Sequence, residues 1–525
     1  MAYWASACFL DTFNNQLLFE YSISPSQNIT GNNNKFVRKH WELCAEKIDK
    51  PDKWIFYAKG GGYRKWWGNL EDVVNWTPEA RNIYQFGDGK HASQIINREY
   101  WYKKGITWGL ITSVMPSFRV MPQGATFDKG GSTIIVNEEY YNYALALLNS
   151  KIYLSIVEIF NPTLNIQVKD VRSVPIVLKD KELIEKLVAD NINISKIDWD
   201  FYENSWEFNR HPLICKTSTL AEAFEQWEKQ CDFRFTFLKS NEEKINSIFI
   251  ETYGLQEDLT PEVEDKDITI RKADLSRDIR SFVSYVVGCM FGRYSLDEEG
   301  LIYAGGKWDC GRYKIFLPDN DNCIPITDEE YFSDDIVGRF VEFVKTVYGD
   351  DTLEENLDFI ANALGNKGDT SREVIRNYFL KDFYADHLKV YQKRPIYWLF
   401  DSGKQNGFKA LIYMHRYDAD TVGRVRTDYL HKAQKYVETA MQSAQYTIDN
   451  ATSASEKSKA TKAVTKYTKQ LAEMKIYDEA IAHVANQRIE IDLDDGVKVN
   501  YAKFQGVEVA QEGKKALKVD LLAKI

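Results

Sequence analysis

Amide and basic side chains gather in one short segment near the start of the sequence, NITGNNNKFVR at 28–38. Asn and Gly tolerate left-handed backbone, so the segment is expected to be a turn-rich loop. Amides can pair bidentately with an adenine edge, and basic groups can pair with phosphate or guanine. We therefore regard Asn32, Asn33, Asn34, Lys35 and Arg38 as candidate DNA-binding residues. The alternative is that the segment is only a structural turn.

A second segment interleaves basic and aromatic residues, WIFYAKGGGYRKWW at 54–67. No acid lies between Lys53 and Trp67, and three glycines would let the backbone approach a partner closely. This composition suits a nucleic-acid groove. The alternative is a β-hairpin whose aromatic residues form core and whose charges are solvated. The candidate DNA-binding residues of this segment are Lys59, Tyr63, Arg64, Lys65 and Trp66.

The third segment is pinned by two prolines, SVMPSFRVMP at 113–122. If it is extended, Ser117 and Arg119 point to one face and become candidate DNA-binding residues. The alternative is a buried edge strand.

The fourth segment is a basic stretch at 404–436, where seven Lys or Arg face three acids in a chain whose net charge is −10. Such a stretch suits phosphates, and its candidate DNA-binding residues are Lys404, Arg424 and Arg426. A solvated charged face is the alternative.

Several catalytic patterns are missing from the sequence. The Asn/Asp-Pro-Pro-Tyr type of loop that grips a flipped adenine would need adjacent prolines, and none of the twelve prolines has a proline neighbour. Neither a G-x-G-x-x-G turn nor a Walker phosphate loop is present. The seven Cys and seven His show no metal spacing. We therefore predict no catalytic, cofactor-binding or metal-binding residues in this chain.

The composition is that of a large globular protein. Of the 525 residues, 44% are apolar and 27% are charged, and no apolar run is long enough to span a membrane. Scattered cysteines and a poor N-terminal leader favour a reducing compartment, so a cytoplasmic location without membrane attachment is expected.

The periodicities predict a multidomain α+β fold, with mixed β-rich lobes joined by helical segments and a C-terminal antiparallel helical pair. We expect a strand at 132–136 and helices at 138–159 and 334–348. Apolar residues at steps of three and four predict two long helices within 425–488 that fold back on one another. Asp495-Gly496 between two apolar runs predicts a hairpin at 489–501.

These elements suggest five parts. They are a β-rich lobe at 1–180, a helical linker region at 181–285, a second mixed lobe at 286–415, the helical pair at 416–488, and a hairpin with a tail at 489–525.

Taken together, the segments resemble the C-terminal, target-recognition part of the PglX family, the adenine-specific DNA methyltransferases of BREX phage-defence systems. They are also similar to the specificity regions of fused restriction-methyltransferases. The resemblance covers most of the chain, although Asn32 follows Gly31 where the family loop usually has an acid. The matching stretches are TGNNNKFVR at 30–38, KGGGYRKWWGN at 59–69, GITW at 105–108, FDKGG at 127–131, NIQVKDV from 165, DWD and SWEF within 198–208, GLIYAGG at 300–306 and KRPIYWLF at 393–400.

The resemblance implies that the chain selects the DNA site for an enzyme that uses S-adenosylmethionine, while the catalytic domain lies upstream in the family and is absent here. The implied partners are double-stranded DNA, an upstream methyltransferase domain or split partner chain, and other BREX defence proteins. Two other hypotheses remain open. The chain is a protein-interaction scaffold of the defence complex, or it is a self-contained enzyme of unrecognised type.

Overall fold

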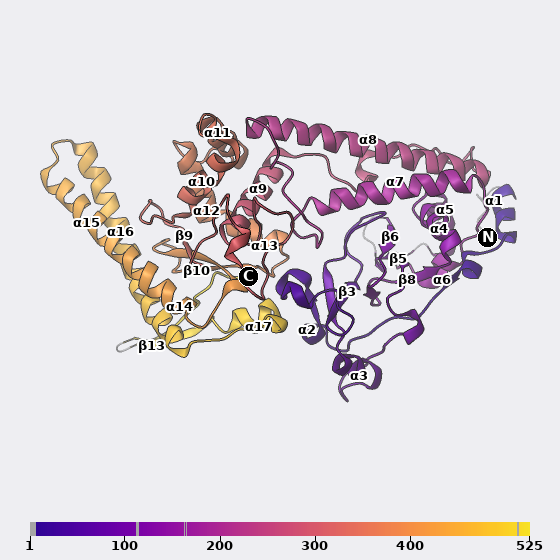
Figure 1. Cartoon of the computed structure of the whole chain (residues 1–525), viewed down its shortest axis with the longest axis horizontal. Helices are drawn as coiled ribbons and strands as arrows, with labels where there is room; N and C mark the ends of the chain where they lie inside the picture. Colours follow the sequence, from indigo (N-terminus) through magenta and orange to yellow (C-terminus); the bar gives the residue numbers. More distant parts are fainter. Residues whose placement is uncertain (1–6, 112–114, 162, 164, 512–513) are drawn as a thin grey trace. The chain divides into compact units, whose positions relative to one another are not determined.

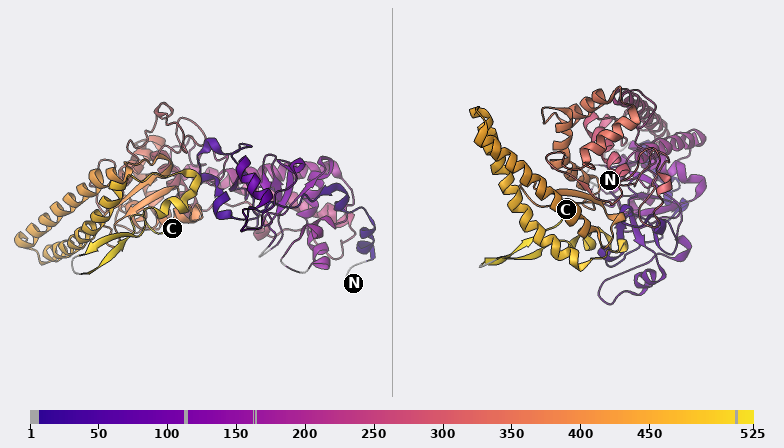
Figure 2. Two further views of the ribbon diagram at one scale, coloured as in Figure 1. Left: turned by 90° about the horizontal axis from the view of Figure 1, so that it is seen from below. Right: turned by 60° about the vertical axis from the view of Figure 1, so that its left-hand side comes forward.

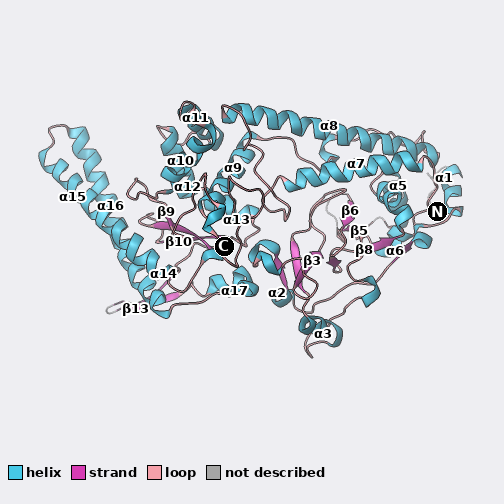
Figure 3. Cartoon of the chain, in the orientation of Figure 1, coloured by secondary structure: helices cyan, strands magenta, loops and turns pink. Residues whose placement is uncertain are grey.

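The computed structural model of the chain describes residues 7–111, 115–161, 163, 165–511 and 514–525 (Figure 1). The chain divides into two compact units. The first comprises Met1–His40, Lys47–Phe208 and Gln226–Ala273, and the second comprises Trp41–Glu46, Asn209–Glu225 and Asp274–Ile525. Helices and several small sheets occur together, which confirms the predicted multidomain α+β fold (Figure 3). The finer five-part division stays a prediction.

The first unit contains a four-stranded antiparallel sheet with the strand order β1-β8-β5-β6. The strand predicted at 132–136 is confirmed as β8. The sheet buries Ile106, Trp108 and Phe118 in the largest core of the unit. The strands are β1 (Ser22–Ile23), β8 (Thr133–Val136), β5 (Gly105–Trp108) and β6 (Phe118–Met121).

The helix predicted at 138–159 is divided in two. A 3-10 turn, Glu138–Tyr140, leads into α4 (Tyr141–Leu148), and α5 (Lys151–Phe160) follows after a break. At the break the backbone of Ser150 is extended, and the neighbouring Asn149 amide bonds to strand β6. Its Oδ1 accepts from the N–H of Phe118 and its Nδ2 donates to the Phe118 carbonyl, each at 2.9 Å. The helical periodicity is therefore real, but the prediction of one continuous helix is wrong.

A second sheet of the first unit has the strand order β2-β4-β3-β7. Its last pair, β3 and β7, is parallel, whereas the others are antiparallel. Helix α3 (Pro78–Phe86) contributes Ala80 and Tyr84 to the core of this sheet. The strands are β2 (Val37–Lys39), β4 (Asp72–Asn75), β3 (Trp54–Ala58) and β7 (Thr126–Phe127), and the short helix α2 (Asn33–Phe36) precedes β2.

Two long helices complete the first unit. They are α7 (Lys181–Asp200) and α8 (Leu220–Thr252). The first residues of α8, those before Gln226, belong to the second unit. Apolar residues of both helices, such as Val188 and Phe249, join the core of the first sheet. The shorter helices are α1 (Ala7–Asp11) and α6 (Val168–Arg172).

The second unit has a three-stranded antiparallel sheet with the order β10-β11-β9, and a run of helices lies between its strands β9 and β10 in sequence. The helix predicted at 334–348 is confirmed as α10, which Asp335 caps by accepting from the N–H groups of Val337 and Gly338. The elements are α9 (Leu275–Met290), β9 (Ile324–Pro325), α10 (Ile336–Tyr348), α11 (Leu353–Leu364), α12 (Ser371–Lys381), α13 (Phe383–Val390), β10 (Tyr397–Asp401) and β11 (Lys409–Tyr413).

The predicted helical pair is confirmed. After α14 (Thr421–Arg424) and a π-helical turn, Val425–Leu430, the chain forms α15 (His431–Asn450) and then returns as α16 (Ala454–Gln487) (Figures 1 and 2). The Thr468 hydroxyl lies 3.7 Å from the Met441 sulfur across the seam. Among the described residues, no helix is both long and apolar enough to cross a membrane.

The hairpin predicted at 489–501 is wrong. A 3-10 turn, Leu493–Asp495, and helix α17 (Gly496–Ala502) occupy its place. Val497 and Tyr501 are four residues apart, so both can be buried on one helical face. The Asn500 amide donates to the carbonyls of Asp492 and Gly496 and fixes the turn. A hairpin does form later, from β12 (Val507–Gln511) and β13 (Lys514–Val519).

Candidate nucleic-acid interface

The basic residues of the 59–69 segment are turned into the first unit. The Arg64 guanidinium forms an ion pair with Asp198 of α7 at 2.8 Å and donates to the carbonyls of Ser195, Thr269 and Trp67. Only 5% of the Arg64 surface is exposed. Such a guanidinium has its donors satisfied inside the protein and has no free face for a phosphate.

Lys65 and Trp66 share one buried carboxylate. The Lys65 ammonium and the Trp66 indole N–H each donate to Glu242 of α8 at 2.7 Å. Burial alone would lower the pKa of Lys65, but Glu242 and the Tyr63 hydroxyl outweigh burial and raise the pKa above its usual value. Tyr63 itself is half-buried and donates to the Asp267 carbonyl. This part of the segment therefore fastens the loop to α8.

Ser117 and Arg119 are also internal. The Ser117 hydroxyl accepts from the Arg64 N–H at 3.1 Å, and Arg119, 1% exposed, donates to the Gly60 carbonyl. Burial, followed by the charge of Arg64, lowers the pKa of Arg119 to about 10. Ser113 and Val114 of the same predicted segment lie outside the described residues.

The burial of these residues weighs against their predicted DNA-contacting role, which stays a prediction. A side chain that is enclosed by the fold and paired with carboxylates or carbonyls would have to leave its partners before it could meet a duplex. In this structure Arg64, Lys65, Trp66, Ser117 and Arg119 position the loop.

The 28–38 loop behaves differently, because most of its predicted residues face solvent. Asn33, Asn34 and Lys35 are exposed, and Asn32 is partly exposed. The Asn32 side chain caps α2 by accepting from the Lys35 N–H at 3.2 Å. Arg38 is the exception, since it is buried and donates to the carbonyls of Asn34 and Val37. Three of the five predicted residues therefore have exposed side chains.

A pocket of about 300 Å³ opens beside this loop. The Asn33 Oδ1 accepts from the Thr30 hydroxyl at 2.7 Å, and the amide nitrogen of Asn33 has no partner among the described residues. Lys129 on the same pocket is exposed. The pocket thus combines an amide donor that has no partner among the described residues with an exposed ammonium group. Its lining residues are Asn28, Ile29, Thr30, Gly31, Asn33, Tyr57, Ala92, Asp128 and Lys129.

The parallel pairing of β3 and β7 brings Lys59 close to Asp128, which lines this pocket. The Lys59 ammonium lies 3.8 Å from the Asp128 carboxylate. Close contact of the two loops requires glycine, because Gly60 has a φ of +90° and a Cβ there would lie 2.7 Å from the Gly130 carbonyl. Burial raises the pKa of Asp128, while the N–H of Gly131 and the charge of Lys59 oppose that shift.

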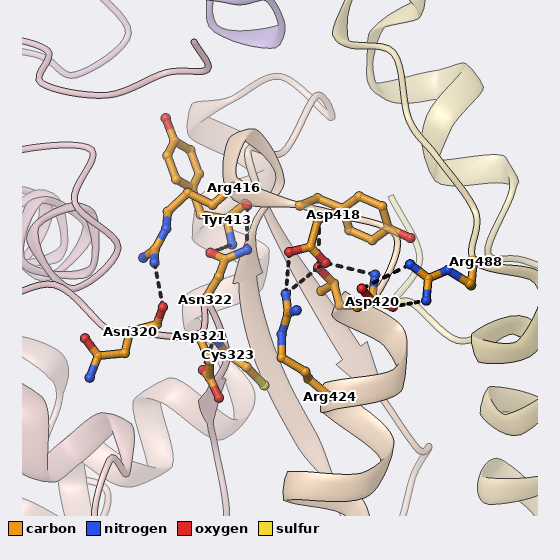
Figure 4. Close-up of polar contacts among 12 residues, drawn as sticks. Asn320, Asp321, Asn322, Cys323, Tyr413, Arg416, Asp418, Asp420, Arg424 and Arg488 are labelled. Carbon is orange, nitrogen blue, oxygen red and sulfur yellow. Dashed lines mark hydrogen bonds and ion pairs between the residues drawn. The ribbon is translucent and has the colours of Figure 1, made fainter. Parts of the chain in front are cut away.

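In the second unit, the basic stretch is largely neutralised by internal partners. Arg424 pairs with Asp418 at 2.9 Å, as Figure 4 shows, and Arg426 pairs with Asp478 at 2.7 Å. The Arg416 guanidinium donates to the Asp319 carbonyl and lies over the Trp308 ring. Of the predicted residues here, Lys404 alone is exposed.

Sequence reasoning missed two residues of the pocket, Asp128 and Lys129. Both lie in the FDKGG stretch. Its glycines predict a turn but do not predict which residues pack against that turn. The partner of that turn is residue 57, which pairs with residue 126 in parallel register. Such a long-range pairing leaves no local periodicity from which it could be predicted.

The structure gives no sign of a metal or disulfide centre among the residues it describes. Six cysteines there are free thiols, and no group of three His, Cys, Asp or Glu side chains is placed to hold a metal ion.

Comparison with known proteins supplies relatives for nearly the whole chain. It is 42% identical, over an alignment of 535 positions, to the adenine-specific methyltransferase PglX of Lacticaseibacillus casei (strain Zhang). It is 35% identical, over 539 positions, to the adenine-specific methyltransferase BrxX of Escherichia coli O9:H4 (strain HS). Each alignment covers 96% of this chain and 44% of the relative. No protein-family model matches the chain. The chain is therefore PglX-like in sequence, and it spans less than half the length of the curated relatives it matches.

Proposed function

We propose that this chain is the DNA target-recognition portion of an adenine-specific, S-adenosylmethionine-dependent methyltransferase of a BREX-type phage-defence system. Methyl transfer would belong to a catalytic domain in another segment or another chain, which would also hold S-adenosylmethionine. The partners would be double-stranded DNA, that catalytic domain and other defence proteins, in the cytoplasm.

The observation that carries the proposal is the similarity to two adenine-specific methyltransferases over 96% of the chain, combined with the lack of adjacent prolines in its sequence. A loop that holds a flipped adenine depends on such prolines for its stiffness. The remaining task of such an enzyme is to choose the site, and this chain would perform it.

The pocket beside the 28–38 loop is the proposed place of base contact. Asn33 offers an amide, which suits the N6 and N7 edge of adenine, and Lys129 and Lys35 offer charges for nearby phosphates. A good bidentate contact contributes roughly 1–3 kcal/mol of discrimination. Replacing Asn33 should therefore change which sequence is preferred, whereas replacing Lys129 should weaken binding to every sequence.

The experiment is selection of the chain's preferred duplexes from a randomised DNA pool, followed by anisotropy titrations. The variants are Asn33→Ala and Lys129→Gln. Their matched controls are Asn97→Ala and Lys103→Gln, because Asn97 and Lys103 are exposed residues of the same unit that do not line the pocket. We expect Asn33→Ala to relax the base preference at one position of the selected sequence. We expect Lys129→Gln to make the slope of log affinity against log salt concentration less steep by about one unit.

A protein-interaction scaffold is the alternative function, favoured by the long helical pair and by the net charge of −10. The same titrations separate the two. A scaffold would show no duplex binding at low salt. Binding without any selected sequence, or equal effects of the pocket variants and their controls, would remove the recognition role from this pocket.

A further inference from the structure

The N-terminal half of α16 carries a continuous lysine face. Lys459, Lys462, Lys466 and Lys469 follow one another at steps of three, four and three, which places them on one side of the helix. All four are exposed. The buried residues of α16 occupy other positions, such as Ala460 and Met474. The lysine face is therefore not part of the packing that holds the helical pair together.

Internal ion pairs do not account for this face. Lys466 pairs with Asp328, but Lys459, Lys462 and Lys469 form no ion pair with any residue that the structure describes. No acid occurs from 457 to 472, and seven lysines face three acids over 431–472, whereas the whole chain has a net charge of −10. These lysines differ from the arginines of the neighbouring stretch at 416–426, which have carboxylate or carbonyl partners.

Helix stability alone does not select such an arrangement. Like charges three or four residues apart repel one another, and cations near a helix N-terminus oppose the helix dipole. A stripe of one charge at helical spacing is, however, well matched to a polyanion. From 459 to 469 it covers about 15 Å of helix axis, and each strand of duplex DNA presents one phosphate per about 3.4 Å of its own axis.

We propose that the lysine face of α16 binds the phosphate backbone of double-stranded DNA, independently of sequence. This proposal rests on the proposed function, since it assigns a second DNA contact to the same chain. The occupant is DNA rather than a membrane, because the exposed side of this part of α16 carries lysines and threonines and no apolar anchor. In the second unit, the loop end of the α15–α16 pair extends beyond the other elements (Figures 1 and 2).

The test uses the full chain and a fluorescent duplex of random sequence, titrated by anisotropy over a series of salt concentrations. The variant is Lys459→Gln, Lys462→Gln and Lys469→Gln together. The control is Lys432→Gln, Lys435→Gln and Lys475→Gln, which removes the same charge from exposed positions elsewhere on the helical pair. Circular dichroism and thermal unfolding establish that both variants keep the native fold.

A plot of log affinity against log salt concentration has a negative slope. We expect this slope to be less steep by about 2–3 in the lysine-face variant, since each lost phosphate contact contributes about 0.9. The control should leave the slope within one unit of the wild type. The sequence preference selected from a random pool should be the same in all three proteins.

Each other outcome overturns the inference in a recognisable way. Duplex binding with equal slopes in the variant and the control overturns the lysine face alone and leaves the proposed function intact. Polyglutamate binding that depends on the three lysines, with DNA binding that does not, would assign the face to an acidic protein instead. If the wild-type chain binds no duplex at low salt, the proposed function and this inference fail together.

Discussion

The Lys65 ammonium lies 2.7 Å from the Glu242 carboxylate in the interior of the first unit, and the same carboxylate accepts the indole N–H of Trp66. Two residues of the basic-aromatic segment thus depend on a single acid of α8. Both partners of the ion pair are less than a tenth exposed. Removing one partner would leave the other charge buried without compensation.

Replacing Glu242 with Ala should therefore destabilise the protein by about 3–5 kcal/mol, the usual loss when a buried ion pair is broken. Urea denaturation followed by tryptophan fluorescence measures the loss. The matched control is Glu228→Ala, an exposed position of the same helix, which should change stability by less than about 0.5 kcal/mol. Equal losses in the two variants would contradict the structural role of the pair.

The pH dependence of this pair has a definite sign. Because the pKa of Lys65 is raised in the folded protein, its contribution to stability is fully present below about 10.4, the pKa of an unfolded lysine. It is lost as the pH rises from there through the folded pKa. The pair should therefore be intact throughout the neutral range.

Three buried histidines of the second unit should make it sensitive to acid. Burial lowers the pKa of His211, His387 and His415 to about 3. Each stays neutral in the folded state but protonates near 6.5 when the chain unfolds. Stability is therefore full above 6.5 and is lost as the pH falls from there toward 3, by up to about 1.4 kcal/mol per pH unit for each histidine.

Denaturant unfolding at pH 7.5, 6.5 and 5.5 measures this loss. A matched comparison is His211→Phe, because His211 lies against the rings of Phe282 and Tyr285 and an aromatic ring can take its place. The variant should lose less stability than the wild type between pH 6.5 and 5.5. An identical loss in both proteins would show that His211 does not titrate on unfolding.

How far the sequence predicts the fold depends on whether the signal is local. The helical pair is evident because buried positions recur at helical spacing, such as Ala433 and Val437 in α15 and Ala460 and Met474 in α16. At 489–501 the sequence predicts a hairpin where a helix forms, because Val497 and Tyr501 fit the alternation of a strand and the four-residue step of a helix equally well. In short segments the tertiary partner decides, and here the Val497 N–H donates to Glu42, far away in the sequence.

The same limit applies to the candidate interface. The composition of the 59–69 segment predicts a DNA-binding surface, whereas in the structure Arg64 and Lys65 pair with carboxylates of α7 and α8, more than 130 residues later. A sequence pattern cannot distinguish a cation that awaits a phosphate from one that already has an acid. The exposed loop at 28–38 was easier to predict, since Asn and Gly favour a turn whatever surrounds it.

Arg426 allows the two kinds of cation to be compared in the second unit. Its guanidinium donates twice to Asp478, which also bonds to His431. Arg426→Gln should cost about 0.5–1 kcal/mol of stability, as for a partly exposed ion pair. It should leave the salt dependence of DNA binding unchanged. Lys404→Gln, at an exposed position of the same basic stretch, is the comparison for salt-slope titrations, and a lower slope for Arg426→Gln than for the wild type would contradict this assignment.

Asp128 is the one carboxylate that lines the pocket beside the 28–38 loop, and it lies 3.8 Å from Lys59. Asp128→Asn removes a charge that repels phosphate and releases Lys59 to meet one. We expect about two- to fivefold tighter binding to random duplex at pH 7.5, the effect of one charge near the surface. The control Asp232→Asn makes the same charge change at an exposed position of α8 and should have a smaller effect.

The pH profile of the Asp128→Asn variant isolates the carboxylate itself. Because burial raises the pKa of Asp128, the wild-type side chain should become neutral at a less acidic pH than an ordinary aspartate. The affinity of the wild type should therefore approach that of Asp128→Asn as the pH falls from 7.5 into the acidic range, and Asp232→Asn is the comparison over the same range. A difference between wild type and Asp128→Asn that does not shrink with acid would mean that Asp128 does not face the bound DNA, and the pocket would then have to be placed outside the interface.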